Sequence, residues 1–212
     1  LDMTPMRRRI LLATASSAAL ASRNAYAQSG LPVRLLVGFA PGGTVDLTAR
    51  ALAEAMRPAL GRPVIVENRP GAAGRLVLEA VKAAAPDGDT LMLVPHGPMT
   101  LFQWIYRQLR YDPVKDFSPV GRVCVIDYAL AVGAGASARA LPDYIAWARA
   151  NPGKINFATA GQGGATHLTG VWLHNATQTN VTFVHFKGAG AYLGELLGER
   201  VDVGITGLST AL

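Results

Sequence analysis

The strongest constraint on the fold is the alternation of short apolar runs with longer helical patterns from residue 31 onward. The pattern predicts strands at Val33–Phe39, Val64–Glu67 and Thr90–Val94, separated by helices at Asp46–Leu60 and Gly71–Ala85. Strands that alternate with helices form parallel sheets covered on both faces. The first half of the chain is therefore predicted to be a doubly wound α/β unit.

The second half repeats this alternation. The predicted elements are helices at Pro142–Ala150, Ala165–Ala176 and Ala189–Leu197 and strands at Ile155–Thr159, Val181–Phe186 and Val201–Ile205. Between the halves lie Pro98–Arg107, which we expect to be helical, and an apolar segment, Val123–Val132. We therefore expect an α/β fold of two doubly wound lobes with a cleft between them. Lobe 1 would span residues 28–122 and lobe 2 residues 123–212.

Residues 1–27 differ from the rest of the chain. A basic triplet, Arg7–Arg9, precedes an apolar and small-residue run, Ile10–Ala21, and the triplet Ala25–Ala27 reads A-Y-A. This order is typical of a secretory signal peptide, here cut after Ala27, and it leaves general and twin-arginine export both open. No later run approaches the roughly 20 apolar residues of a membrane span. We expect an exported, periplasmic protein.

Charge and cysteine content exclude further classes. Without residues 1–27, which hold four arginines and one aspartate, the net charge drops from +6 to about +3, and the basic residues are scattered. Nucleic-acid binding needs clustered basic residues and is not expected. The single cysteine, Cys124, lies between two valines and is predicted to be a small core residue. Trp147 and Trp172 lie on predicted helices and are expected to be packing residues.

Four glycine-bearing loops follow predicted strands. They are Ala40–Gly43, Pro95–Gly97, Ala160–Gly164 and Lys187–Gly190. Ligands of open parallel sheets bind beyond the carboxyl ends of the strands. A helix N-terminus presents unpaired N–H groups and about half a positive charge, and glycine lets an anion approach it closely. These loops are suited to a carboxylate or a phosphate.

The nucleotide-binding motifs are incomplete. Gly43 runs into Thr44 and Val45 instead of the Gly-Lys-Ser/Thr of a phosphate-binding loop. A dinucleotide fingerprint, G-x-G-x-x-G, fails in the two later loops, where Thr166 and Leu193 replace its last glycine. We expect no nucleotide and no other cofactor.

No catalytic or metal-binding arrangement is complete either. Gly207–Ala211 half resembles a nucleophile elbow, but no acid and histidine follow it in the printed sequence. His167 and His174 lie seven residues apart on one predicted helix, about 10.5 Å, which is too far for one metal ion. We expect neither an enzyme nor a metal site.

Each loop residue also has a purely structural interpretation. Glycines between a strand and a helix are common turn formers. Thr44 is suited to capping a helix, and Asp46 would complement the dipole in its first turn. Thr166 and His167 could cap the helix that they begin, and Lys187 could be a solvated lysine.

Taken together and in order, several segments resemble one family. They read FAPGGTVDLTARALAE, PVIVENRPGAAG, APDGDTLML, YDPVKDFSPVGRV, NPGKINFATAGQGGATHLTG, VHFKGAG and LLGERVDVG. These segments are similar to the substrate-binding receptors of tripartite tricarboxylate transporters, also called Bug proteins. The resemblance covers residues 31 to 212 almost without a gap.

The resemblance implies a periplasmic-binding-protein fold of type II that captures a small carboxylate and passes it to the membrane permease subunits of a transporter. It implies that backbone N–H groups and bridging waters of Phe39–Asp46 and Ala160–His167 hold the carboxylate. We expect a monomer whose ligand-binding residues are Phe39, Ala40, Gly42, Gly43, Thr44, Asp46, His96, Gly97, Ala160, Gly161, Gly163, Gly164, Thr166, His167, Lys187 and Gly188.

The sequence departs from the family pattern at four places: Arg75, His96–Pro98, Ala191 and the pair Thr206-Gly207. Family chains also continue past the point that matches Leu212 and return to lobe 1, so we expect that the given chain lacks this return segment. Three alternatives stay open: a binding protein that feeds a sensor kinase, a non-functional truncated member and, less favoured, a small hydrolase.

Overall fold

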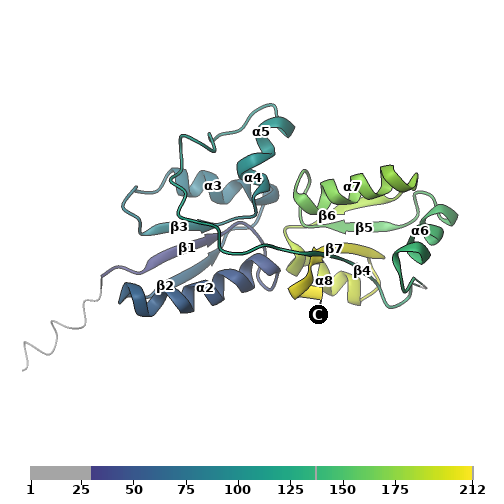
Figure 1. Cartoon of the computed structure of the whole chain (residues 1–212), viewed down its shortest axis with the longest axis horizontal. Helices are drawn as coiled ribbons and strands as arrows, with labels where there is room; N and C mark the ends of the chain where they lie inside the picture. The colour runs from purple at the N-terminus through teal and green to yellow at the C-terminus, as the bar shows by residue number, and fades with distance from the viewer. Residues whose placement is uncertain (1–29, 137, 212) are drawn as a thin grey trace, which may run out of the picture.

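The computed structural model describes residues 30–136 and 138–211, which form two α/β lobes (Figure 1). The predicted signal peptide, residues 1–27, lies outside the described residues. Within the described ranges, no helix is both long and apolar enough to cross a bilayer.

The first sheet contains three parallel strands in the order β2-β1-β3. They are β1 (Val33–Val37), β2 (Val64–Asn68) and β3 (Thr90–Leu93). Helix α2 (Thr44–Leu60) follows β1, and α3 (Arg75–Lys82) follows β2. The α/β class and the parallel order of this half are as predicted.

Successive side chains of β1 point to opposite faces of the sheet. Leu35 belongs to a core cluster with Ala49 of α2, whereas Leu36 clusters with Val77 of α3. Because β1 is buried on both faces, it can be almost continuously apolar.

Two predicted helices are shorter than expected. The segment Gly71–Ala85 begins with a tight turn, η2 (Ala72–Gly74), in which Ala73 has a φ of 55°, and the regular helix α3 starts only at Arg75. The segment Pro98–Arg107 forms two single-turn helices, α4 (Gly97–Thr100) and α5 (Phe102–Ile105), instead of one continuous helix.

The second sheet has the order β4-β7-β5-β6. Its strands are β4 (Tyr128–Val132), β5 (Asn156–Thr159), β6 (Thr182–His185) and β7 (Val203–Gly207). Its helices are α6 (Leu141–Ala150), α7 (Ala165–Thr177), α8 (Ala189–Leu197) and the short α9 (Leu208–Ala211). Three strands are parallel, and β4 pairs with β7 in the antiparallel direction.

Both faces of the second sheet are also covered. Phe157 of β5 clusters with Tyr144 of α6, and the next residue, Ala158, clusters with Tyr192 of α8. The first sheet uses residues 33–93 and the second uses residues 128–207. The predicted boundary between residues 122 and 123 stays a prediction.

Two residues that were predicted to be packed are exposed. Cys124 is exposed because it lies in the irregular connection that leads to β4, so its assignment to the core was wrong. Trp172 is 70% exposed on α7, so its assignment as a packing residue was also wrong. Trp147 does pack against the core of the second lobe, as predicted.

Candidate functional site

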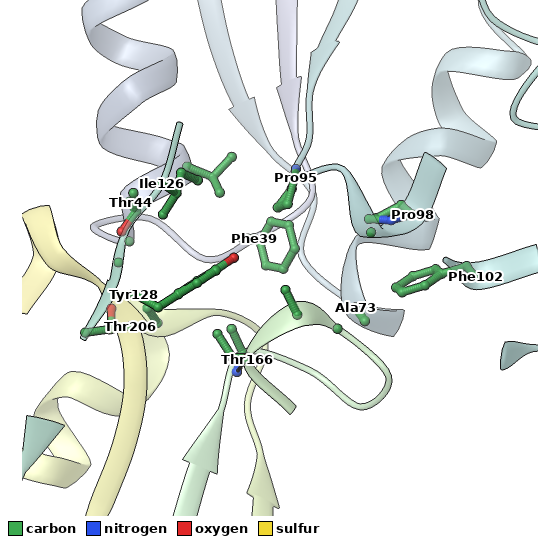
Figure 2. A pocket seen from close by; sticks show the side chains of 18 residues that line it. Phe39, Thr44, Ala73, Pro95, Pro98, Phe102, Ile126, Tyr128, Thr166 and Thr206 are labelled. Carbon is green, nitrogen blue, oxygen red and sulfur yellow. Dashed lines mark hydrogen bonds between the residues drawn. The ribbon is translucent and has the colours of Figure 1, made fainter. Parts of the chain in front are cut away.

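A cavity of about 60 Å³ lies where the two lobes meet (Figure 2). From the first lobe, its lining comes from the loops after β1 and β3 and from η2. From the second lobe, the lining comes from the loop after β5, the start of α8, β7, and β4 together with the connection before β4. The lining residues are Phe39, Gly43, Thr44, Val45, Ala73, Pro95, Gly97, Pro98, Phe102, Ile126, Tyr128, Ala160, Gly164, Ala165, Thr166, Ala189, Thr206 and Gly207.

Two long helices begin at this cavity, one from each lobe. The N-cap residues of α2 and α7 are Gly43 and Gly164, and neither helix start has a side-chain cap. The segments Gly43–Val45 and Gly164–Thr166 both line the cavity. Because the first N–H groups of a helix have no partner inside it, each uncapped start favours an anion. The predicted Thr44 cap does not form.

Seven of the sixteen predicted site residues line the cavity: Phe39, Gly43, Thr44, Gly97, Ala160, Gly164 and Thr166. The other nine do not appear in its lining: Ala40, Gly42, Asp46, His96, Gly161, Gly163, His167, Lys187 and Gly188. Ligand contact by any of the sixteen stays a prediction. Several of the nine have contacts that shape the loops around the cavity.

Asp46 holds the first glycine loop in place. Its side chain is 2% exposed and accepts hydrogen bonds from the Gly42 N–H at 2.9 Å, Asn68 Nδ2 at 2.8 Å and Arg50 Nε at 3.0 Å. Burial alone would raise the pKa of Asp46, but these hydrogen bonds and the Arg50 charge outweigh it and lower the pKa. The carboxylate therefore stays ionised and is already fully paired within the protein.

Lys187 and Gly188 join the two lobes through their backbone. The Ala40 N–H donates to the Lys187 carbonyl oxygen at 2.9 Å. Lys187 itself is an exposed residue. Gly188 has a φ of 129°, and a Cβ there would come within 2.9 Å of the Ala40 nitrogen. These residues set the approach of the loops.

The histidines of the predicted site also have structural partners. His96 is exposed, and its Nδ1 lies 3.1 Å from the Thr100 hydroxyl. His167 Nδ1 accepts a hydrogen bond from the Gly163 N–H at 3.1 Å, so this ring nitrogen is unprotonated and holds the second glycine loop. Burial and the neighbouring His185 lower the pKa of His167, which favours the neutral ring. No group of three or more metal-ligating side chains occurs in the described ranges.

Most of the apolar lining and two residues with hydroxyl groups, Tyr128 and Thr206, were not among the predicted site residues. Thr206 is 1% exposed, and its hydroxyl has no hydrogen-bond partner of acceptable geometry among the described residues. The nearby Tyr192 hydroxyl donates to the Ile205 carbonyl; burial raises the pKa of Tyr192 to about 12, and the Thr206 hydroxyl opposes that rise. The only sequence signal for Thr206 was its departure from the family pattern.

Acid should destabilise the second lobe through His174. This side chain is 5% exposed, lies between the hydroxyls of Tyr144 and Thr179, and has its pKa lowered by burial. Below about pH 6.5 the unfolded chain binds a proton that the folded chain does not, so the free energy of unfolding falls by at most about 1.4 kcal/mol per pH unit. Urea unfolding at pH 7.5 and 5.5 measures this slope. A His174→Gln variant should reduce this slope, and His167 and His185, whose pKa values are also lowered by burial, should keep part of it.

The fold and the cavity are those of a two-lobed solute-binding protein. A family model described as the tripartite tricarboxylate transporter family receptor matches residues 48–212. The chain therefore belongs to this family, which confirms the resemblance seen in the sequence.

Curated relatives support the same assignment. A protein in the gbd 5′ region of Cupriavidus necator is 36% identical over 209 residues, which cover 92% of this chain and 62% of that protein. Protein BugT of Bordetella pertussis is 31% identical over 204 residues, which cover 96% of this chain and 62% of BugT. The chain thus spans less than two thirds of the length of these relatives.

Solved structures share the fold. The periplasmic binding protein BugD aligns with a TM-score of 0.78 and 34% identity, over 83% of this chain and 58% of BugD. MatC of Rhodopseudomonas palustris with bound malate aligns with a TM-score of 0.79 and 30% identity, over 85% and 61%. A second R. palustris protein, solved with adipate, aligns with a TM-score of 0.78 and 29% identity, over 85% and 60%.

Proposed function

We propose that this protein is a periplasmic receptor that captures a small carboxylate and delivers it to the permease subunits of a tripartite tricarboxylate-type transporter, without chemical change. The observation that carries the proposal is the meeting of two uncapped helix starts, one from each lobe, at a single cavity. Such a site attracts an anion from both sides of the cleft.

Most of the ligand contacts that we propose are backbone contacts. Thr44 and Val45 would supply N–H groups from lobe 1, and Ala165 and Thr166 would supply them from lobe 2. The Thr166 hydroxyl already accepts a hydrogen bond from the Ala160 N–H at 3.0 Å, so its own hydrogen is available to the ligand. The carboxylates bound by MatC and by the adipate-binding relative agree with this ligand class.

A proline at the start of α7 tests the proposal. Ala165→Pro removes one N–H group at the cavity while keeping the helix, because proline suits the first helical position and Gly164 before it is already extended. We expect an affinity for carboxylates lower by about tenfold, since a hydrogen bond to a charged group contributes roughly 1.5 kcal/mol. The midpoint of thermal unfolding should not change.

Titration calorimetry against a panel of small mono- and dicarboxylates measures this effect. The matched control ligand is the amide of each acid, which keeps the body and loses the charge. Absence of binding to every carboxylate by the folded protein, or equal binding of acids and amides, would contradict the proposed function.

A further inference from the structure

The cavity offers about one unit of positive charge. None of the described lining residues has a charged side chain. The starts of α2 and α7 each contribute about half a positive charge. Helix α8 also begins here, but a Cβ on Gly190 would overlap the Pro41 carbonyl oxygen, so the chain itself covers that start. The ionised Asp46 carboxylate in the first turn of α2 is offset by its ion pair with Arg50. One negative charge on a ligand is therefore balanced and a second is not.

The lining away from the helix starts is apolar except for the hydroxyl of Tyr128, which points toward Phe39 in Figure 2. In Figure 2, Thr44 and Thr206 lie at one end of the cavity and Pro98 and Phe102 at the other, with Phe39 between them. Pro95, Ala73 and Ile126 complete this apolar wall. A second charged group placed against this wall would lose its water without gaining a charged partner, which is unfavourable.

Thr206 supplies an independent sign of a ligand. Thr206 lines the cavity, and its buried hydroxyl has no hydrogen-bond partner of acceptable geometry in the part of the chain that the structure describes, because the neighbouring Tyr192 hydroxyl donates to the Ile205 carbonyl instead. Buried hydroxyls are rarely left unpaired. In Figure 2, Thr206 lies on the same side of the cavity as Thr44, the first residue of α2.

We propose that the ligand is a monocarboxylate with an apolar body, whose carboxylate accepts a hydrogen bond from the Thr206 hydroxyl. The inference rests on the proposed carboxylate receptor and narrows its ligand class. It sets this protein apart from the two relatives solved with the dicarboxylates malate and adipate. The carboxylate lies between the starts of α2 and α7, and the body of the acid contacts the apolar wall.

Two matched pairs of acids test the charge of the ligand. Hexanoate and adipate have the same chain length, as do butanoate and succinate, and each pair differs by one carboxylate. Calorimetry at pH 7.5 should show at least one monocarboxylate binding at least tenfold more tightly than its dicarboxylate partner. Dicarboxylates that bind as tightly or more tightly would overturn the inference and leave the proposed function intact. If none of the four acids nor any other carboxylate bound the folded protein, the proposed function itself would fail.

Thr206→Val tests the hydroxyl. Valine keeps the shape of the side chain, so the affinity for the tighter monocarboxylate should fall about tenfold, whereas the unfolding midpoint should stay the same or rise because an unpaired polar atom is gone. Thr159→Val is the matched control. Thr159 is also buried at a strand end, but its hydroxyl is paired with His185 Nδ1 at 2.7 Å. Loss of the Thr159 hydroxyl should lower the unfolding midpoint and leave the ratio of mono- to dicarboxylate affinity unchanged.

Unchanged affinity in Thr206→Val would show that Thr206 does not contact the ligand.

Discussion

Replacing Gly190 by alanine is expected to lower the free energy of unfolding by about 2 kcal/mol, even though alanine favours helices. A Cβ at this position would overlap the Pro41 carbonyl oxygen, because the two atoms would lie much closer than the 3.0 Å that Cβ contacts in proteins keep. Backbone cannot rotate away as a side chain can, so α8 or the loop before α2 must shift. Overpacking of this kind costs about 1–3 kcal/mol. Urea unfolding monitored by circular dichroism measures the change.

Gly194 provides the control within the same helix. A Cβ there meets nothing within 4 Å, so Gly194→Ala should raise the free energy of unfolding by up to about 1 kcal/mol through helix propensity alone. If Gly190→Ala lowers the free energy of unfolding and Gly194→Ala raises it, the contact between the lobes at Gly190 is the cause of the loss. If Gly190→Ala also stabilised the protein, the close approach of α8 to the first glycine loop would be wrong.

Replacing Asp46 by alanine is expected to have the largest effect on stability, a loss of about 3 kcal/mol. The substitution leaves the Gly42 N–H without its acceptor and removes one of the two acceptors of Asn68 Nδ2, which also donates to the Phe39 carbonyl oxygen. It also removes a negative charge from the first turn of α2. Because the pKa of Asp46 is lowered in the folded state, its contribution is present above about pH 4 and is lost as the pH falls through the folded value. Chemical denaturation at pH 7 and pH 3 measures both effects.

Glu54→Ala is the matched control on the same helix. Glu54 pairs with Arg57 on the surface, and both side chains are more than half exposed. Surface pairs of this kind contribute about 0.5 kcal/mol. A similar loss for both variants would mean that the Asp46 hydrogen bonds do not hold the loop.

Both predictions concern how the first glycine loop is held. Asp46 fixes the loop from within lobe 1, and α8 lies against it from lobe 2. The start of α2 can face a ligand only while both contacts keep it at the cavity. We therefore expect that loss of either contact also weakens carboxylate binding.

Local patterns were sufficient for the class of fold and for part of the candidate site. The apolar run at β1 and the glycines after it predicted a buried strand followed by a helix start, because both depend on residues close together in sequence. The same reasoning located the start of α7. It could not show that Asp46 holds the first glycine loop, because its partner Asn68 lies 22 residues away.

Other features depend on contacts between distant segments. Ala73 was expected inside a regular helix, yet its positive φ places it in a turn at the cavity. Cys124 lies in an apolar run and is nevertheless exposed, because this part of the chain forms the irregular connection between the two lobes. Tyr128 and Thr206 reach the cavity through the antiparallel pairing of β4 with β7, which joins residues almost 80 positions apart. No local pattern encodes that pairing.

By itself, the sequence determined the alternation of strands and helices, the glycine loops at helix starts and the family, because these follow from short-range periodicity and from ordered motifs. The tertiary structure decided which loops meet. It placed two helix starts from different lobes at one cavity, assigned Asp46 and Lys187 to holding the loops together, and brought the unpaired Thr206 hydroxyl to the same place. The physical reason is that hydrogen bonds and close packing between lobes depend on distances in space, which no spacing along the chain specifies.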